Sequence, residues 1–465
     1  MTIDSYSDAK ELLDRHGQGQ LLDFWDKLSD TERSALLSQI ETLDFPSIAR
    51  MQSMLGQGDA AQAAFGAGTL PAEVMTPSEQ ETADAINIGE SSLSEGRVGV
   101  ILVAGGQGSR LGFDGPKGAF PVAPITNATL FEIHCHKILR LEEKYDTQIP
   151  FYVMTSETNN KPTHDFFAEN NYFGLDPERV LFFIQGMWPT LTGEGKIILD
   201  SPHHIFMSPD GHGGTITALK NSGALDDMAS RGLDTLFYFQ VDNPLIEIAD
   251  PAFIGLHANT GADVSVKVCA KRDAGEGLGV VAARDGHNMV IEYIDLPEEE
   301  AAATLPDGSL KFLYGSVAIH VFSLGFLKQE ANAELPLHVA HKKVPYCNAD
   351  GETVRPGEPN AFKFEKFIFD VLPDANTVLN LAFAREEEFS PVKNATGADS
   401  PETTQRDMIR KYSRWLEACG IEVPKDDSGT PVYKIEIDPR FAGNVQDLRS
   451  KLPQDFAVTD DVLLV

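Results

Sequence analysis

An apolar run that opens into a glycine-rich loop, residues 98–120, constrains the fold and chemistry of this chain more than any other stretch. The run Val98–Val103 predicts a buried strand. The loop after it contains four glycines, namely Gly105, Gly106, Gly108 and Gly112. Glycines at the end of a strand let backbone N–H groups approach a phosphate closely, and Arg110 and Lys117 add positive charge to the same loop. The stretch therefore predicts a phosphate-binding loop.

From residue 98 onward, short apolar runs alternate with helical segments. Strands are predicted at 98–103, 151–155, 180–185, 235–241 and 262–269, and helices at 129–144 and 163–170. Such alternation is typical of an α/β fold with a parallel, doubly wound sheet. In that architecture ligands bind at the carboxyl ends of the strands, so Asp242 is expected at the same edge as the glycine loop.

The residues that flank this α/β core predict smaller additions. Residues 8–54 show helical periodicity, with a helix start at Ser29 that is followed by Glu32. The stretch 56–72 is rich in Gly and Ala and the stretch 76–95 is polar, so both predict a linker. We therefore expect three parts, an N-terminal helical region with its linker at 1–95, an α/β domain at 96–385 and a C-terminal lobe at 386–465.

Beyond residue 278 the pattern becomes less regular. Strands are predicted at 279–281, 291–294 and 314–322, an aromatic-rich helix at 363–371, and, after Pro401, a helix and a strand at 432–437. The acidic run 298–300 predicts a solvated face. The irregular stretch therefore extends the sheet with mixed strands and ends in a small lobe.

The amino-acid composition makes some classes of binding partner unexpected. It has 38 Lys and Arg against 70 Asp and Glu residues, a formal net charge of −32. Such a charge repels nucleic acid and anionic membranes, so neither is expected as a partner. No run approaches the roughly 18 apolar residues of a membrane span, and the four cysteines include no Cys-x-x-Cys pair. We expect a cytoplasmic protein that is a monomer or a weak homo-oligomer.

Two common phosphate-binding patterns do not match the glycine loop. A Walker loop requires G-x-x-x-x-G-K-[ST], and the dinucleotide fingerprint requires G-x-G-x-x-G. Counted from Gly106, Leu111 occupies the position of the final glycine in both patterns. The pattern that does match is GGQGSRLG followed by GPKG, which resembles the signature of the sugar-nucleotide pyrophosphorylases.

The resemblance extends over most of the chain. The further segments that carry it are YFGLDPERVLFFIQGM, SPDGHGG, FQVDNPL, AHKKVPY, KFEKFIFD and EEFSPVKNA. These segments look like the eukaryotic-type UDP-N-acetylhexosamine pyrophosphorylases. The resemblance implies a GT-A-like, Rossmann-type nucleotidyltransferase domain with a mixed, mostly parallel sheet. It also implies a reaction that joins UTP and a sugar 1-phosphate to give a UDP-sugar and pyrophosphate.

Such a reaction needs positive charge more than it needs a base. The attacking sugar phosphate is already an anion, so catalysis rests on positioning and charge neutralisation. Arg110 and Lys117 are therefore expected to contact the triphosphate and the transition state. Asp242 follows an apolar strand and is the predicted Mg²⁺ ligand, because magnesium commonly uses one or two carboxylates. A cap of the next helix is the alternative role for Asp242.

The resemblance implies further contacts to phosphate and uracil. Lys393 and Lys363 would contact the phosphates of the sugar-bearing side, and Lys393 would take part in catalysis. Uracil and the nucleotide would be bound by Gly105, Gly106, Gln185 and Gly211. A side-chain amide can pair with the adjacent donor and acceptor of a pyrimidine edge. The alternative for Gln185 is a buried amide that bonds a turn.

The implied sugar site departs most from the family pattern. Its residues would be His212, Gly279, Glu292, Ser316, Phe367 and Phe369. His212 stands in GHGG where the N-acetylhexosamine enzymes show GNGG, and Ser316 replaces an expected Asn. Phe367 and Phe369 match positions near the acetyl methyl group, with core aromatics as the alternative. N-acetylglucosamine 1-phosphate is the expected substrate, and glucose 1-phosphate or a broad range of sugars is the alternative.

Two rival functions are weighed against this one. A nucleotide-sugar binding protein that has lost catalysis would not need the predicted cations and Asp242 intact. A GT-A glycosyltransferase usually binds its metal through D-x-D, whereas Asp242 is followed by Asn243-Pro244. The reaction products distinguish the classes, because nucleotidyl transfer releases pyrophosphate and glycosyl transfer releases UDP.

Overall fold

The computed structural model describes residues 3, 5–55 and 65–465. The chain forms two compact units. Unit 1 combines Met1–Ala64, Gln185–Thr215 and Glu334–Asp370, and unit 2 combines Phe65–Ile184, Ile216–Ala333 and Val371–Val465. Each unit is therefore assembled from three separate stretches of chain. The division into three consecutive domains at residues 95 and 385 stays a prediction.

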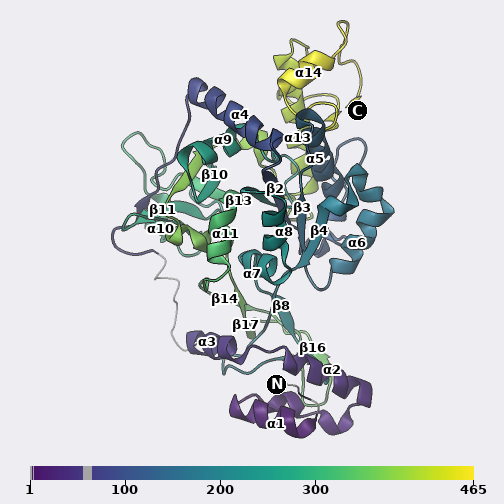
Figure 1. Ribbon diagram of the computed structural model, residues 1–465, viewed down its shortest axis with the longest axis vertical. Coiled ribbons are helices and arrows are strands. Elements are labelled where there is room, and N and C mark those ends of the chain that lie inside the picture. Colours follow the sequence, from purple (N-terminus) through teal and green to yellow (C-terminus); the bar gives the residue numbers. More distant parts are fainter. Residues whose placement is uncertain (1–2, 4, 56–64) are drawn as a thin grey trace. The chain divides into compact units, whose positions relative to one another are not determined.

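Unit 2 is built around a ten-stranded sheet with the path β1-β11-β13-β9-β2-β3-β4 (Figure 1). Its central strands are parallel, as the alternation of strands and helices predicts. They are β9 (Thr235–Gln240), β2 (Val98–Val103), β3 (Phe151–Thr155) and β4 (Val180–Ile184). Burial on both faces explains why β2 and β3 are almost continuously apolar. All four carboxyl ends therefore lie at one edge of the sheet.

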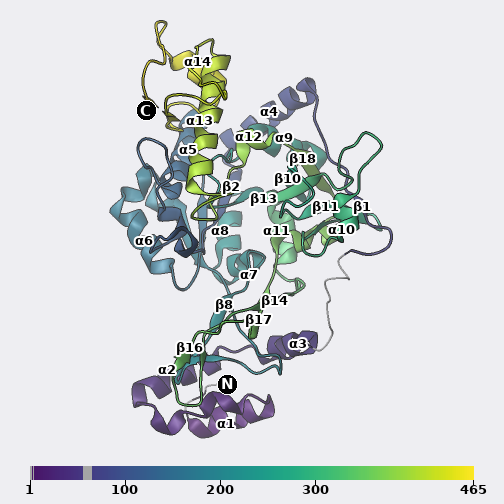
Figure 2. The ribbon, with the colours of Figure 1, turned by 180° about the vertical axis from the view of Figure 1, so that it is seen from behind.

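The rest of the sheet makes it mixed. The long strand β13 (Tyr314–Ser323) runs antiparallel to β9, β10 and β11. The other strands are β1 (Leu70–Pro71), β10 (Val264–Ala270), β11 (Val280–Arg284), β12 (His287–Ile291) and β18 (Val378–Ala382). Figure 2 shows β18 beside β10, to which it pairs in parallel. The strand predicted at 291–294 lies earlier in the chain, because His287–Ile291 pairs with β11 through a turn at Asp285 and Gly286.

Helices cover this sheet. Those between the central strands are α5 (Leu130–Tyr145), α6 (Asn160–Glu169), α7 (Gly214–Asn221), α8 (Ala224–Ser230) and α9 (Pro251–Thr260). The start of α5 is fixed by Thr129 and Glu132, which form a capping box. Further along are α10 (Glu298–Ala302) and α11 (Leu324–Glu330). The acidic run at the start of α10 is largely exposed, as predicted.

The sequence suggested that the polar stretch 76–95 is a linker. In the structure this stretch contains the helix α4 (Glu79–Ser94). It begins at a capping box made by Ser78 and Glu81, and it lies alongside α9 (Figure 1). The two helices approach closely because Gly89 faces the backbone of Pro251 and Gly255 faces the backbone of Ala85. Small residues therefore make the buried face that large apolar residues make elsewhere. Of the linker predicted at 56–72, residues 56–64 lie outside the described residues.

The C-terminal part of unit 2 contains the predicted helix and a short pair of strands. The elements are α12 (Arg385–Glu388), α13 (Pro401–Ala418), β19 (Ile435–Ile437), α14 (Val445–Lys451) and β20 (Val462–Leu464). The strand predicted at 432–437 is thus confined to its last three residues, which pair in parallel with β20. Trp415 and Leu416 of α13 belong to the same apolar core as β2 and β3.

Unit 1 joins the N-terminal helices to small strands from later in the chain. The helices are α1 (Tyr6–Arg15), α2 (Asp30–Glu41) and α3 (Phe45–Leu55), and the capping box predicted from Ser29 and Glu32 is present. The strand pairs are β5 (Met187–Pro189) with β8 (Met207–Pro209), β6 (Leu199–Ser201) with β7 (His204–Ile205), β14 (His338–Lys342) with β17 (Ala361–Glu365), and β15 (Tyr346–Cys347) with β16 (Thr353–Val354). Leu13, Leu36, Leu191 and Phe364 share one apolar core.

The helix predicted at 363–371 is wrong. Its first part is β17, which pairs with β14, and its last part is the beginning of a 3₁₀ segment, Ile368–Asp374. The spacing of the aromatic residues resembles one face of a helix, but pairing with a strand more than twenty residues earlier decides the backbone. Among the described helices, none has the length and apolar character needed to cross a membrane.

Candidate active site

The glycine loop begins where β2 ends, and a buried asparagine fixes its first turn. The Asn159 side-chain amide donates hydrogen bonds to the carbonyl of Ala104 at 2.8 Å and to that of Gly106 at 3.2 Å. No heavy atom lies within 4 Å of the position that a Cβ atom would take on Gly106. The backbone at Gly106 is thus held by Asn159, while the space beside its Cα atom is open.

The loop returns Lys117 to the end of β2. Gly108 N–H donates to the Gly115 carbonyl at 2.9 Å, and Lys117 N–H donates to the Gly106 carbonyl at 3.1 Å. The next residue, Gly118, packs directly against the ring of Phe131 in α5, so a larger residue would push the turn away. Arg110 lies on the exposed 3₁₀ turn Ser109–Leu111 of the same loop.

Lys117 and Asp242 form a largely buried ion pair at the carboxyl ends of β2 and β9. The Lys117 Nζ atom lies 3.0 Å from Asp242 Oδ2. Burial by itself would raise the pKa of Asp242, but the charges of Lys117 and Lys393 outweigh it and hold this pKa below its ordinary value. The next helix, α9, is capped by Asp250 and not by Asp242, so the alternative role for Asp242 does not apply.

The segment that carries Lys393 is tied to the same strand end. Val392 N–H donates to the Asp242 carbonyl at 2.8 Å, and the Asn243 amide both donates to the Glu388 carbonyl and accepts from Ser390 N–H. Unit 2 therefore gathers Lys117, Lys393 and Asp242, three predicted residues from distant parts of the sequence.

The residues at this place can hold a magnesium ion only if a bound substrate supplies further oxygen ligands. Among the described residues, no group of three or more His, Cys, Asp and Glu side chains is arranged to hold a metal. Magnesium, however, commonly takes one or two carboxylates and fills its other positions with phosphate oxygens and water. Asp242 supplies one such carboxylate, with one oxygen already bonded to Lys117. A metal here would depend on substrate phosphates.

Three residues predicted at the sugar lie together, Gly279 just before β11, Glu292 just after β12 and Ser316 in β13. The Gly279 carbonyl accepts from Ser316 N–H at 2.9 Å. A Cβ atom on Gly279 would lie 2.8 Å from the Glu292 Oε1 atom, so any side chain at this position would displace the carboxylate. Gly279, Glu292 and Ser316 therefore form one small polar cluster in unit 2.

In unit 1, Gln185 is bonded to the glycine turn that follows β8. Its Nε2 atom donates to the Gly211 carbonyl at 3.0 Å, and the Gln185 side chain is buried. Gly211 has φ +85°, and a Cβ atom there would collide with the Lys366 carbonyl. Only glycine combines this backbone with this close approach. Gln185 does bond a turn, the alternative weighed for it, and this bond also holds its amide in place.

Asp210, next to this turn, carries a strongly perturbed carboxyl group. Burial raises its pKa to about 7, against the charge of Lys366, which lowers it. Its Oδ1 atom is buried without a hydrogen-bond partner in the part of the chain that the structure describes. A buried, incompletely bonded carboxyl group beside a predicted ligand site is a functional candidate.

His212, Phe367 and Phe369 form an aromatic group in unit 1. The His212 ring stacks on Phe367 with centroids 5.3 Å apart, and Phe369 lies 5.8 Å from His212. His338 stacks on Phe367 from another direction and bonds Asp370 at 2.8 Å. The predicted residues of this group therefore contact one another directly.

His212 is a neutral imidazole. Burial lowers its pKa to about 4, with a further contribution from His338. Its Nδ1 atom accepts from the Ile368 backbone N–H at 3.1 Å, so the proton of the neutral ring is on Nε2. The His212 ring is thus uncharged.

Two lysines of the 361–366 segment differ in their surroundings. The predicted Lys363 lies in β17 with its Nζ atom 5.3 Å from the centre of the Phe206 ring, and burial lowers its pKa. Lys366 is the lysine whose charge acts on Asp210, and its carbonyl accepts from Gly213 N–H at 2.8 Å. The sequence reasoning missed Lys366, Asp210 and Asn159. Lys366 and Asp210 stand in the quoted segments KFEKFIFD and SPDGHGG, which were the available signal, whereas Asn159 acts on backbone more than fifty residues earlier and no spacing marks it.

Comparisons with known proteins give a consistent result. The family model described as UTP–glucose-1-phosphate uridylyltransferase matches residues 68–454. A human UDP-N-acetylhexosamine pyrophosphorylase-like protein 1 is 37% identical over 94% of this chain and 92% of its own length. The yeast UDP-N-acetylglucosamine pyrophosphorylase is 33% identical over 95% and 98%. The solved structure of the Trypanosoma brucei uridine diphosphate N-acetylglucosamine pyrophosphorylase matches with a TM-score of 0.82 and 25% identity, over 100% of this chain and 99% of that one.

Proposed function

Because the chain belongs to the UTP–glucose-1-phosphate uridylyltransferase family, we propose that it transfers the uridylyl group of UTP to N-acetylglucosamine 1-phosphate. The products are UDP-N-acetylglucosamine and pyrophosphate. The observation that carries the proposal is the gathering of Lys117, Lys393 and Asp242 beside an open glycine loop. The curated relatives, which are named for this class of reaction, support the choice of sugar.

The proposed step is an in-line displacement at the α-phosphorus of UTP. An oxygen of the sugar 1-phosphate forms a new bond to this phosphorus, and the bond to the oxygen that bridges the α- and β-phosphates breaks. Pyrophosphate leaves with the electron pair of that bond. The nucleophile is already an anion, so no general base is required, and catalysis consists of positioning and charge stabilisation.

The cations of unit 2 would carry this stabilisation. Lys117 and Arg110 are assigned to the triphosphate and the charge that develops in the transition state, and Lys393 to the phosphates of the sugar side. When bound, a divalent cation such as Mg²⁺ would add charge neutralisation, and Asp242 is the carboxylate that would hold it. The buried pair with Lys117 keeps Asp242 ionised and correctly oriented before the substrate arrives.

The nucleotide is assigned to backbone amides at Gly105 and Gly106, and to Gln185 and Gly211. The bond from Gln185 to the Gly211 carbonyl leaves the Gln185 carbonyl oxygen available to a uracil donor. Lys363 is assigned to phosphate, and burial lowers the pKa of its ammonium group.

The sugar is assigned to His212, Phe367 and Phe369 in unit 1, and to Gly279, Glu292 and Ser316 in unit 2. An imidazole can hydrogen-bond either a hydroxyl or an amide, so His212 by itself does not choose between the two sugars. Glucose 1-phosphate is therefore the second candidate substrate, and the observation that favours it is this histidine in place of the amide that the N-acetylhexosamine enzymes show.

A panel of initial rates tests the proposal. Pyrophosphate release is measured with UTP and each of N-acetylglucosamine, N-acetylgalactosamine and glucose 1-phosphate. We expect the highest kcat/KM with N-acetylglucosamine 1-phosphate. No pyrophosphate with any sugar phosphate would overturn the reaction class, and a preference for glucose 1-phosphate would overturn the sugar. Lys117→Ala is the inactive control, and Lys161→Ala, at an 82% exposed side chain, is the matched active control.

The setting of the enzyme is also a proposal. All four cysteines, Cys135, Cys269, Cys347 and Cys419, are free thiols, which favours a reducing compartment such as the cytoplasm. The expectation of a monomer or a weak homo-oligomer stays a prediction.

A further inference from the structure

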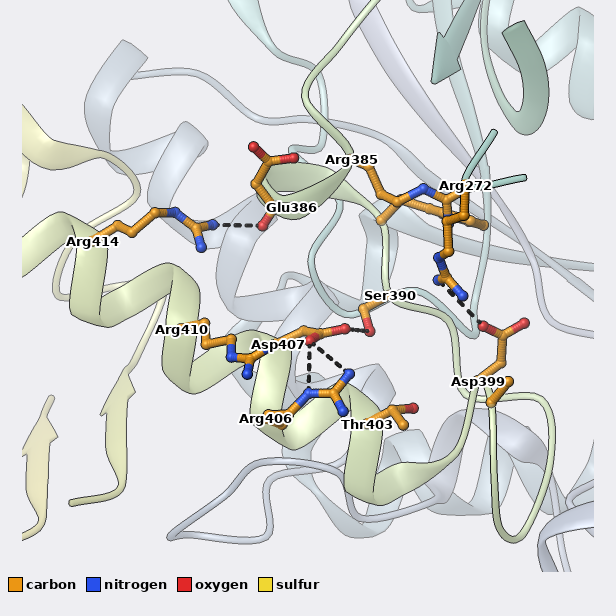
Figure 3. A pocket seen from close by; sticks show the side chains of 12 residues that line it. Arg272, Arg385, Glu386, Ser390, Asp399, Thr403, Arg406, Asp407, Arg410 and Arg414 are labelled. Atoms are coloured by element: carbon orange, nitrogen blue, oxygen red, sulfur yellow. Dashed lines mark hydrogen bonds and ion pairs between the residues drawn. The ribbon is translucent and has the colours of Figure 1, made fainter. Parts of the chain in front are cut away.

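Unit 2 contains a cavity of about 350 Å³ that none of the predicted site residues lines. It lies between α12, residues 403–414 of α13 and the segment 389–399 (Figure 3). Its volume is at the lower end of the roughly 300–1,000 Å³ typical of small-molecule sites. The cavity is therefore large enough for a small ligand and separate from the residues assigned to the reaction.

Arginines dominate the lining of this cavity. They are Arg272, Arg385, Arg406, Arg410 and Arg414, against three carboxylates, Glu386, Asp399 and Asp407. The lining itself holds more arginines than carboxylates, and Glu276 and Glu387, which pair with Arg385 and Arg414, lie outside it. Guanidinium groups bind phosphate through paired N–H donors, so this lining suits a phosphorylated anion.

Three of these arginines repeat every four residues along α13. Arg406, Arg410 and Arg414 thus lie on one face of the helix, where like charges at this spacing repel. Arg406 is bonded to Asp407 at 3.2 Å and Arg414 to Glu387 at 2.6 Å. In the part of the chain that the structure describes, no carboxylate lies within ion-pair distance of Arg410, whose side chain is drawn in Figure 3 without an interaction. The repulsion along this face is therefore only partly relieved within the protein.

Arg385 adds a second, independent sign of a missing anion. Its Nη2 atom donates to Glu276 at 2.8 Å, and its guanidinium stacks on the Phe389 ring at 5.3 Å. Its Nε and Nη1 atoms are buried without a hydrogen-bond partner among the described residues. Buried donors are nearly always bonded in folded proteins, and the neighbour that the chain offers to this guanidinium is the weakly accepting thiol of Cys269, so a stronger acceptor such as an anion fits here.

We propose that this cavity binds a polyphosphate anion, the shared chemistry of inorganic polyphosphates and nucleotide phosphate tails. Arginines four residues apart on a helix are separated by about 6 Å along its axis, so Arg406, Arg410 and Arg414 reach successive parts of a linear chain of phosphoryl groups. Hydrogen bonds from Arg385 fix one end of the anion.

The cavity is linked to Lys393 through Asp399. The Asp399 carboxylate lies 3.9 Å from Arg272 in the cavity wall, and the Asp399 carbonyl accepts from Lys393 N–H at 2.6 Å and from Asn394 N–H at 3.0 Å. Asp399 has φ 54°, a strained conformation that these contacts hold. An anion in the cavity competes with Asp399 for Arg272. Occupation of the cavity therefore shifts the turn that presents Lys393, and with it the rate of the enzyme.

Calorimetric titration with inorganic tripolyphosphate tests the binding. The titration is done on Lys117→Ala with metal chelated, so that it does not depend on turnover or on the proposed reaction. Adding Arg410→Gln should weaken tripolyphosphate binding at least tenfold. Adding Arg15→Gln, which removes the same charge from an exposed site, should leave it unchanged. Equal affinity with and without Arg410→Gln, or an equal loss with Arg15→Gln, would overturn the proposal.

Two further measurements identify the ligand source and the coupling. Titration with ATP under the same conditions distinguishes the sources, because a nucleotide site binds ATP more tightly than tripolyphosphate and a polyphosphate site does not. Amide hydrogen exchange in residues 390–400 should change on tripolyphosphate addition, and this change should vanish with Arg410→Gln. Arg410→Gln in an otherwise native chain should retain its basal turnover and lose the effect of tripolyphosphate on it. Unchanged exchange in this segment despite binding would overturn the coupling to Lys393.

Discussion

The ammonium group of Lys117 lies 3.0 Å from the carboxylate of Asp242, and the two side chains are only 17% and 12% exposed. Both charges have lost most of their hydration, so each depends on the other. The charge of Lys393 acts on the same carboxylate. The strand ends of β2 and β9 thus hold two cations against one anion, an arrangement that binding of a polyphosphate would balance.

Lys117→Met is expected to reduce both activity and stability. Loss of a preorganised cation lowers kcat by about 10²–10³-fold. It also leaves the buried Asp242 carboxylate with less compensation, at a cost of about 3 kcal/mol in the free energy of unfolding. In the double variant Lys117→Met/Asp242→Asn, stability should recover while kcat stays low. Initial rates and urea unfolding measure the two effects, and a double variant that regains activity would contradict the catalytic role of Lys117.

Asp242→Asn alone is expected to weaken Mg²⁺ binding at the proposed metal site without abolishing it. An amide oxygen is a poorer ligand for Mg²⁺ than a carboxylate, so the Mg²⁺ concentration for half-maximal rate should rise at least tenfold. Metal titrations of both proteins at saturating UTP measure this concentration. Asp165→Asn, which alters an exposed carboxylate paired with Lys161, is the control and should titrate like the native chain. A native metal dependence in Asp242→Asn would refute the assignment.

Asp210 is expected to make the stability of the protein fall between about pH 4 and pH 7. The pKa of this carboxyl is about 7 in the fold and near its ordinary value of 3.8 in the unfolded chain. Between these values unfolding releases a proton, so a rise in pH favours unfolding, and above pH 7 the full cost of the buried charge applies. This cost is at most roughly 4 kcal/mol, from a shift of about 3 units at 1.36 kcal/mol each.

Asp210→Asn removes the titrating group and tests this directly. The variant should be stabilised relative to the native chain by more at pH 8 than at pH 5. Urea unfolding at the two pH values measures the difference in the free energy of unfolding. The same relative stability at both values would contradict the raised pKa of Asp210.

His212 is expected to act through the hydrogen bond that its Nδ1 atom accepts from Ile368 N–H. In His212→Leu the Ile368 N–H loses its acceptor, which costs about 1–3 kcal/mol and loosens the segment that carries Phe367 and Phe369. We expect the KM for the sugar 1-phosphate to rise about tenfold, a change of roughly 1.4 kcal/mol, with the KM for UTP unchanged. His212→Asn retains an acceptor near the same place and should stay within a few-fold of the native KM. A native KM in His212→Leu would remove His212 from the sugar site.

The sequence could predict that the glycine loop and Asp242 lie at the same edge of the sheet, and the reason is physical. Parallel strands that follow one another bring their carboxyl ends to one edge, so an apolar run followed by glycines and another followed by Asp242 must lie close. The pairing of β2 with β9 confirms this. The supporting contact from Asn159 could not be predicted, because its backbone partners lie more than fifty residues earlier and no spacing marks the residue.

Other elements were predicted wrongly, and for β17 the reason is that its hydrogen-bonding partner is distant in the sequence. Residues 363–371 have aromatic spacing that fits a helix, but the backbone of residues 361–365 is hydrogen-bonded to β14. The helix α4 was missed because its buried face consists of small and polar residues, among them Ala85, Gly89 and Ser92. The Ser78 and Glu81 capping box was a signal in the sequence that could have identified its start.

Replacement by alanine is expected to have opposite effects at two glycines, Gly255 in α9, which packs against α4, and Gly325 in α11. In Gly255→Ala the new methyl group meets the Ala85 carbonyl, a backbone atom that cannot rotate away, and overpacking of this kind costs about 1–3 kcal/mol. In Gly325→Ala, in α11, no heavy atom lies within 4 Å of the new methyl group, so the lower entropy of the unfolded chain should stabilise by about 0.4–1 kcal/mol. Thermal unfolding measures both changes, and the initial rate of Gly325→Ala should match that of the native chain. If Gly255→Ala were as stable as Gly325→Ala, the close approach of the two helices would be refuted.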